Sequence, residues 1–294
     1  MYPLFLAVVL GLVPGGAATR SASPGEKFGR YWYQGKAELN RFELDQARYG
    51  EMHKGEAMLI FVTEPFLPDR QVKLEEGDLS KGITVLKLNS VRKFFTGIYP
   101  YSLMTSTFTP VDFSHTRTLK VASSSQEWCG QTFTQVNFRN GRYEGALRSY
   151  FEAEGDREFD FGPAWLEDEL WTRIRLAPDT LPVGRVQVVP GLQYARLWHK
   201  AVRPEEARAS LRSEGGENVY ELDYAAIPRR LAIRFQKEFP YKIVGWTETQ
   251  PGAFDGSPLL TTKAVATASI QLDYWRRHNN ADAHFRKELG LTMW

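Results

Sequence analysis

Short apolar stretches recur along the chain from residue 36 onward, and turn-forming residues separate most of them. Each stretch is roughly six to twelve residues long, which is typical of strands and short for helices. We expect strands at residues 57–62, 83–88, 104–108, 127–138, 142–151, 183–189, 194–201, 219–224, 230–235, 241–249 and 259–269. The pattern predicts a protein built mainly from β-strands.

The sharpest local signal is the dipeptide Asn140-Gly141, which lies between two of these stretches. Asn-Gly readily adopts the positive φ angles of a type I′ turn, and this turn matches the twist of two antiparallel strands. The dipeptide therefore predicts a β-hairpin formed by residues 127–138 and 142–151.

Two segments have the spacing of a helix instead. In residues 163–175, Leu166, Leu170 and Ile174 recur every four residues, and acidic residues lie in the early turns. Residues 270–289 carry one apolar stripe with spacings of three and four, which predicts a closing helix of about twenty residues.

The helix at 163–175 divides two β-rich halves, residues 30–160 and 180–269. No run of Ser, Gly or Pro between them is long enough for an interdomain linker. We therefore expect a single mainly β domain over residues 21–294. Its architecture would be a large curved antiparallel sheet, half-barrel-like, with a mid-chain helix and a C-terminal helix.

The chain opens with an apolar run from Leu4 to Val13, followed by Pro14 and several small residues. The run is too short to cross a membrane, and small residues are what a signal peptidase accepts. We expect a signal peptide over residues 1–20 and a periplasmic or secreted mature protein without a transmembrane anchor. The alternative is a buried first strand.

Charge argues against a nucleic-acid partner. The chain has 37 Lys and Arg against 35 Asp and Glu, a net charge of +2, and its basic residues form no run longer than a pair. A nucleic-acid-binding surface needs basic residues gathered in a patch or stripe. The chain is therefore expected not to bind nucleic acid.

Residue patterns for catalysis are also missing from the sequence. The single cysteine, Cys129, falls in a predicted strand without a neighbouring histidine, which favours a small buried hydrophobic role over a nucleophile. The five histidines form no metal-ligand spacing, and the motifs of serine hydrolases and of phosphate and dinucleotide binding are absent. We predict no catalytic residue, no cofactor and no metal, and these missing patterns favour a non-enzymatic protein without excluding an enzyme.

Aromatic residues are abundant, with 18 Phe, 13 Tyr and 8 Trp, or 13% of the chain. A concave sheet lined with such rings would form an apolar ligand pocket, although a large aromatic core would use the same residues. The residues that we expect to line a ligand site are Phe94, Phe95, Tyr99, Tyr101, Trp128, Trp165, Trp171 and Trp246.

A family resemblance covers roughly residues 160–250. The motifs are Leu181-Pro182-Val183-Gly184-Arg185-Val186, then Arg229-Arg230-Leu231, and Pro240-Tyr241-Lys242-Ile243. With the preceding Leu-rich helix they resemble the exported bacterial family DUF3108. The resemblance implies a curved half-barrel similar to the lipoprotein carriers LolA and LppX, whose concave face holds acyl chains.

The first half, with residues 94–101 and 126–130, resembles a second uncharacterised bacterial family that carries the label "septum formation inhibitor Maf". Maf proteins are cytoplasmic nucleotide pyrophosphatases that begin with a Leu-Ala-Ser-x-Ser-Pro-Arg-Arg motif. Here residues 121–127 match only its start and lack the arginines that would hold phosphates. The label therefore does not predict that activity for this chain.

Together these features predict an exported cell-envelope protein that binds or carries a lipid or other apolar ligand. A second hypothesis is a structural or assembly factor of the envelope, with protein or glycan partners, which predicts a filled core and an exposed aromatic patch. A third is an envelope hydrolase that uses Cys129 or a pair of carboxylates.

Overall fold

The structure, a computed structural model, describes residues 25–112 and 117–293. The signal peptide expected at residues 1–20 lies outside them. The helices are α1 (Glu26–Trp32), α2 (Glu167–Leu176), α3 (Leu192–Leu197) and α4 (His284–Glu288), with 3₁₀ turns η1 (Leu79–Lys81), η2 (Pro178–Thr180), η3 (Tyr274–Arg276) and η4 (Asn280–Ala283).

Strands make up most of the remaining chain. They are β1 (Ala37–Arg48), β2 (Glu51–Leu67), β3 (Val72–Lys73), β4 (Ile83–Thr96), β5 (Tyr99–Pro110), β6 (Lys120–Glu127), β7 (Gly130–Arg139), β8 (Arg142–Ser149), β9 (Arg157–Phe161), β10 (Trp165–Leu166), β11 (Gly184–Val189), β12 (Glu205–Glu214), β13 (Glu217–Tyr224), β14 (Arg230–Gln236), β15 (Ile243–Pro251) and β16 (Leu259–Leu272).

In the described part of the chain, these sixteen strands form one sheet. Its order is β10-β11-β12-β13-β14-β15-β16-β1-β2-β4-β5-β6-β7-β8-β9, with the short β3 paired to β2. The pairs are antiparallel except β10 with β11. Strand β16 pairs with β1, from Ala37 opposite Leu272 onward, so the last strand joins the two halves of the chain. The predicted fold class, a large antiparallel sheet, is confirmed.

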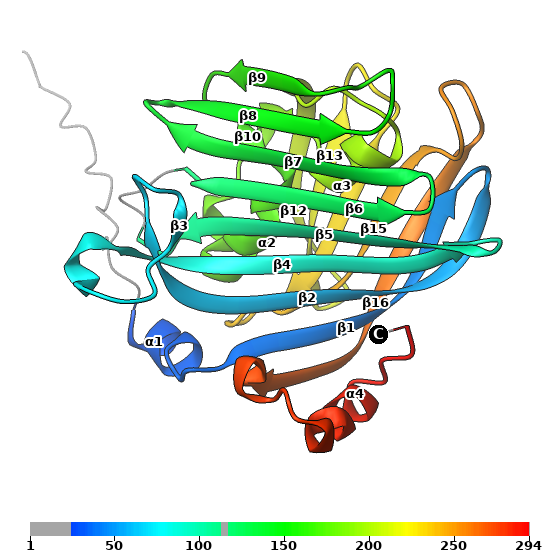
Figure 1. Cartoon of the computed structure of the whole chain (residues 1–294). Coiled ribbons are helices and arrows are strands. Elements are labelled where there is room, and N and C mark those ends of the chain that lie inside the picture. The colour runs from blue at the N-terminus through cyan, green and yellow to red at the C-terminus, as the bar shows by residue number, and fades with distance from the viewer. Residues whose placement is uncertain (1–24, 113–116, 294) are drawn as a thin grey trace, which may run out of the picture.

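The sheet curls on itself. Figure 1 shows strands β5–β8 in front of β12–β15, with helices α2 and α3 between them. The packing agrees, because the largest hydrophobic cluster joins Leu170 and Ile174 of α2 to side chains from both halves of the sheet. The concave side that we expected to face a ligand is thus covered by two helices.

Helix α2 begins later than predicted. The sequence pattern started it at residue 163, but Trp165 and Leu166 instead pair with β11 as the edge strand β10. The helix then begins at Glu167, with Asp168 and Glu169 also in its first turn. Acidic side chains there interact favourably with the positive end of the helix dipole.

The strand predicted at residues 194–201 was wrong, because helix α3 occupies Leu192–Leu197. Tyr194, Leu197 and Trp198 are all buried against side chains of β4 and β5. Their spacing of three and four places them on one helical face. A short apolar run of this kind fits a strand as well as a buried helix, so periodicity alone did not distinguish the two.

Two further boundaries differ from prediction. The strand expected over 127–138 is interrupted at Trp128 and Cys129, which form the turn between β6 and β7. The closing helix expected over 270–289 is broken, because β16 continues to Leu272 and only His284–Glu288 are α-helical. The apolar residues of that segment therefore lie partly at the end of β16 and partly in short helical turns.

The predicted hairpin is confirmed. Strands β7 and β8 pair from Arg139 opposite Arg142, and the turn residues Asn140 and Gly141 have φ angles of 50° and 78°. Both angles are positive, as a type I′ turn requires.

Candidate functional site

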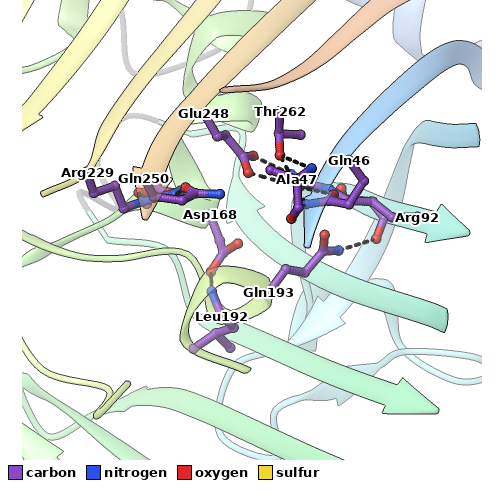
Figure 2. Close-up of polar contacts among 12 residues, drawn as sticks. Gln46, Ala47, Arg92, Asp168, Leu192, Gln193, Arg229, Glu248, Gln250 and Thr262 are labelled. Atoms are coloured by element: carbon purple, nitrogen blue, oxygen red, sulfur yellow. Dashed lines mark hydrogen bonds and ion pairs between the residues drawn. The ribbon is translucent and has the colours of Figure 1, made fainter. Parts of the chain in front are cut away.

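A group of charged and polar side chains lies between α2, α3 and the sheet, and most of it is drawn in Figure 2. All of them are buried except Asp168, which is partly buried. We call this group the interior polar cluster. Its members are Gln46, Arg92, Glu167, Asp168, Gln193, Arg229, Glu248, Gln250 and Thr262.

Two ion pairs neutralise most of the charge in the cluster. The Arg229 guanidinium donates to both carboxylate oxygens of Glu167, with Nε at 3.1 Å from Oε2. Arg92 binds Glu248 in the same two-point manner, with Nη1 at 3.0 Å from Oε2. Burial by itself would raise the pKa of Glu248, but the Arg92 guanidinium lowers it below its usual range. Such pairing is what makes buried charges tolerable.

Asp168 is the acidic member of the cluster that takes part in neither ion pair. Its carboxyl accepts a hydrogen bond from the backbone N–H of Leu192, at the start of α3, over 2.9 Å. Burial raises its pKa, and although the Leu192 N–H opposes this, the nearby Glu167 carboxylate adds to it, so the pKa reaches about 7. In Figure 2, Asp168 lies between the Arg229–Gln250 pair and Gln193.

A small cavity of about 20 Å³ adjoins Asp168, Gln193 and Arg92. The side-chain oxygen of Gln193, which lines this cavity, is buried without a hydrogen-bond partner within the protein. This volume and these polar groups suit about one water molecule. Pockets for drug-sized ligands are about 300–1,000 Å³, so this cavity cannot take a lipid or comparable ligand. The cluster serves to fix α2 and α3 inside the curled sheet.

The second candidate lies at one end of the sheet, where five turns each present an exposed aromatic or aliphatic side chain. We call this surface the hairpin rim, and it lies at the right in Figure 1. Its members, with their exposed fractions, are Tyr49 (49%), Ile98 (82%), Trp128 (68%), Tyr150 (77%) and Phe254 (73%).

Direct contacts join the turns of the hairpin rim into one surface. The Trp128 ring stacks on Tyr99, with centroids 6.2 Å apart. The Tyr99 hydroxyl donates to the hydroxyl of Tyr49 over 3.2 Å. The β1–β2 turn is tied to the β15–β16 turn by the backbone N–H of Gly50, which donates to Gly252 O over 3.0 Å.

The end of α3 supports the same surface from below. The Trp198 indole N–H donates to the backbone oxygen of Pro251 over 2.8 Å. Lys200 pairs with Asp255 at 2.7 Å, and the His199 ring packs edge-on against Phe151. The buried cluster and the hairpin rim are therefore mechanically connected, because Asp168 holds one end of α3 and the rim contacts the other.

The structure separates the eight predicted ligand residues into two groups. Phe95, Tyr99 and Trp128 lie at the hairpin rim, and Phe94 and Tyr101 lie beneath it, fully buried and stacked at 4.8 Å. The remaining three are interior residues near α2. Trp171 and Trp246 pack edge to face at 5.2 Å, and Trp165 packs against the main hydrophobic cluster.

Of the five rim residues, sequence reasoning predicted only Trp128 and missed Tyr49, Ile98, Tyr150 and Phe254. A signal for Ile98 was available, because Gly97 precedes it and glycine beside a large apolar residue between two strands indicates an exposed turn. Tyr150 and Phe254 belong to longer connections, whose geometry a strand pattern does not specify.

The expectation that Cys129 is buried was wrong, because the residue is exposed in the β6–β7 turn. The hydrolase hypothesis would place a histidine such as His115 near Cys129, and His115 lies outside the described residues. His199 is engaged elsewhere, with Nδ1 at 2.6 Å from Glu154 Oε1. Within residues 25–112 and 117–293, no group of three or more His, Cys, Asp or Glu side chains could hold a metal ion.

Comparison with known proteins adds no relative. No family model matches the chain, and neither the curated proteins nor the solved structures include a match. The family resemblances described above therefore stay predictions. Among the described helices, none has the length and apolar character needed to cross a membrane.

Proposed function

We propose that this chain is an exported binding protein of the cell envelope that docks on a lipid surface through the hairpin rim. The observation that carries the proposal is the exposure of Ile98, Trp128, Tyr150 and Phe254, each at the turn of a different hairpin. Large apolar side chains gathered at one end of a protein mark an interaction site.

The residue types favour a lipid surface over a protein partner. Trp and Tyr are enriched where a membrane meets water, because their rings are apolar and their N–H or O–H groups stay hydrated. The apolar side chains are carried on separate turns, so each can enter the interface of a bilayer independently. Burying one such side chain contributes about 1.5–3 kcal/mol, and several together give stable docking.

The interior offers less to an apolar ligand. Helices α2 and α3 occupy the concave side of the sheet, and the cavity beside them is about 20 Å³ and lined by charged groups such as Arg92 and Glu248. An acyl chain cannot form hydrogen bonds with these charged groups and would exclude the water that the space can hold. We therefore place the lipid contact at the hairpin rim.

Vesicle flotation tests the proposal. The full chain is mixed with phosphatidylcholine vesicles, with and without phosphatidylglycerol, and compared with the double variant Ile98→Ser, Trp128→Ser. Leu79→Ser is the matched control, because Leu79 is 72% exposed but lies in η1, outside the rim. We expect the double variant to lose about tenfold or more in partitioning, and the control to match the parent chain.

Two outcomes would overturn lipid docking. One is failure of the parent chain to float with either type of vesicle. The other is an equal loss for Leu79→Ser, which would show that general hydrophobicity rather than the hairpin rim controls partitioning. Either result would leave an envelope assembly role with a protein partner as the better explanation of the exposed rim.

A further inference from the structure

A groove of about 470 Å³ runs along the outer face of strands β6, β7 and β8, beside the hairpin rim. We call it the outer groove. Its exposed lining includes Gln126, Gln131, Phe133, Arg148, Tyr150 and Asp156. The groove shares only Tyr150 with the hairpin rim. Its lining combines two aromatic rings with hydroxyl, amide, guanidinium and carboxylate side chains.

The aromatic part of the groove is held in place by the backbone. Phe133 is 42% exposed and Tyr150 is 77% exposed, so both rings present surface to solvent. The Tyr150 ring lies directly against Gly130, where a Cβ atom would be only 2.7 Å from Tyr150 Cδ1. A side chain at position 130 would therefore push the ring away, and glycine keeps it in the groove.

The polar part is also fixed. Gln126 lies opposite Gln131 across the β6–β7 pair, so two amides flank the groove at one level. Arg148 is held by an ion pair with Glu158 and by a hydrogen bond from Nη1 to the backbone oxygen of Leu147 at 3.0 Å. Strand pairing fixes the backbone positions of the two amides, and the ion pair orients the guanidinium, which limits the entropy that Arg148 loses when it binds a partner.

These features match the chemistry of a sugar ring. A pyranose has one or both faces covered by C–H groups, which pack on an aromatic ring, and a perimeter of hydroxyls that each donate and accept. Amides supply both donor and acceptor, Arg148 supplies donors, and Asp156 supplies an acceptor. A bound anion is less suited, because Asp156 and Glu158 place negative charge beside Arg148.

We propose that the outer groove is a binding site for a pyranose unit of a glycan. The site goes beyond the lipid docking proposed above. It gives the protein two contacts at the same end of the sheet, one apolar at the turns and one saccharide-binding along the strands.

The test uses the full chain with three probes: maltohexaose, cellohexaose and chitohexaose. Binding is measured by saturation-transfer NMR and by calorimetry at millimolar sugar. We expect at least one probe to bind, and Phe133→Ala and Gly130→Ala each to weaken it about tenfold or more. Far-UV circular dichroism and the melting temperature check that both variants fold.

The rim variant Phe254→Ser separates the two proposals. Phe254 lies in the β15–β16 connection and does not line the outer groove, so its loss should leave sugar binding unchanged while weakening flotation with vesicles. Absence of binding by all three probes would overturn the glycan site. A folded Phe133→Ala chain with parental affinity would overturn it as well, and neither result would affect the lipid proposal.

Discussion

Asp168 is an acid whose ionisation the fold opposes. Its pKa is about 7 in the folded chain, compared with an ordinary value of 3.8, because burial and the Glu167 carboxylate outweigh the Leu192 N–H and the two arginines, Arg92 and Arg229. Tyr224 also faces this cluster, and its hydroxyl donates to Glu167 over 2.7 Å. The folded state therefore binds a proton that the unfolded state releases at a much lower pH.

This difference links stability to pH. Between pH 3.8 and about 7 the folded chain holds more protons at Asp168 than the unfolded chain, so the free energy of unfolding falls as pH rises through this window. The effect is at most about 4 kcal/mol, since one pKa unit corresponds to about 1.4 kcal/mol.

We expect Asp168→Asn to remove this dependence, because an amide oxygen can still accept from Leu192 N–H but carries no charge. The variant and the parent should unfold at the same urea concentration near pH 4, and the variant should be the more stable of the two at pH 8. Urea unfolding at both pH values measures the difference. Parallel behaviour of the two chains across this range would contradict the assignment of the raised pKa to Asp168.

Single residues also set the limit of what the sequence could predict. Phe95, Tyr99 and Trp128 were predicted to line a ligand site, and the structure brings them together at one end of the sheet. Asp168 and Arg92 were not singled out, because they lie far apart in the chain and only the curled sheet brings them together. A buried network of this kind has no local sequence pattern.

At the scale of elements, the turn of the β7–β8 hairpin depends on the backbone conformation of Gly141. Gly141 has φ of 78°, a conformation that L side chains adopt at a cost of about 1–2 kcal/mol, and no atom lies within 4 Å of the position of a Cβ. A substitution there changes backbone strain alone, without a steric clash.

Gly141→Ala should therefore destabilise the chain by about 1–2 kcal/mol. Gly162→Ala is the matched control, because Gly162 is also exposed and uncrowded but does not have a positive φ. That change should be neutral or stabilising by up to about 1 kcal/mol, since alanine restricts the unfolded chain. Urea unfolding of both variants tests this, and an equal loss in both would show that strain at residue 141 is not the cause.

Elements were predicted well where alternation or turn chemistry was strong, and poorly where a short apolar run was ambiguous. The Asn140-Gly141 hairpin followed from local chemistry. Helix α3 did not, because the apolar positions of residues 194–201 are too few to distinguish a strand from a helix, and their helical face became evident only against Phe94 and Tyr101. The closing helix predicted over residues 270–289 was wrong for the opposite reason: its apolar residues have helical spacing, but the first of them extend β16.

At the scale of the whole molecule, helix α2 connects both halves of the sheet. Its last turn carries Arg175, which is fully buried and binds both oxygens of Glu38 in β1 at 2.6 and 2.9 Å. Arg175 Nε also donates to the backbone oxygen of Pro240, at 2.8 Å, just before β15. One side chain therefore links β1, in the first half of the chain, to the segment before β15 in the second half.

Burial alone would raise the pKa of Glu38, but the Arg175 guanidinium, with the hydroxyl of Tyr31, lowers it to about 2. Glu38 thus stays charged in the folded interior across the physiological range, and its charge depends on Arg175 for compensation. This contribution to stability is present above the ordinary pKa of 4.5 and is lost as pH falls from there toward 2.

Replacing Arg175 with methionine should therefore leave a buried carboxylate without its partner and cost about 3–5 kcal/mol. Arg230→Met is the matched control, because Arg230 pairs with Asp223 at 2.9 Å but is 55% exposed, and exposed pairs contribute about 0–1 kcal/mol. The double variant Glu38→Leu, Arg175→Met should recover much of the loss, since no uncompensated charge remains.

Urea unfolding followed by tryptophan fluorescence and by far-UV circular dichroism should give coincident transitions, because α2 couples the halves. A loss for Arg175→Met no larger than that of the control would show that the halves are held together by strand pairing between β16 and β1 alone.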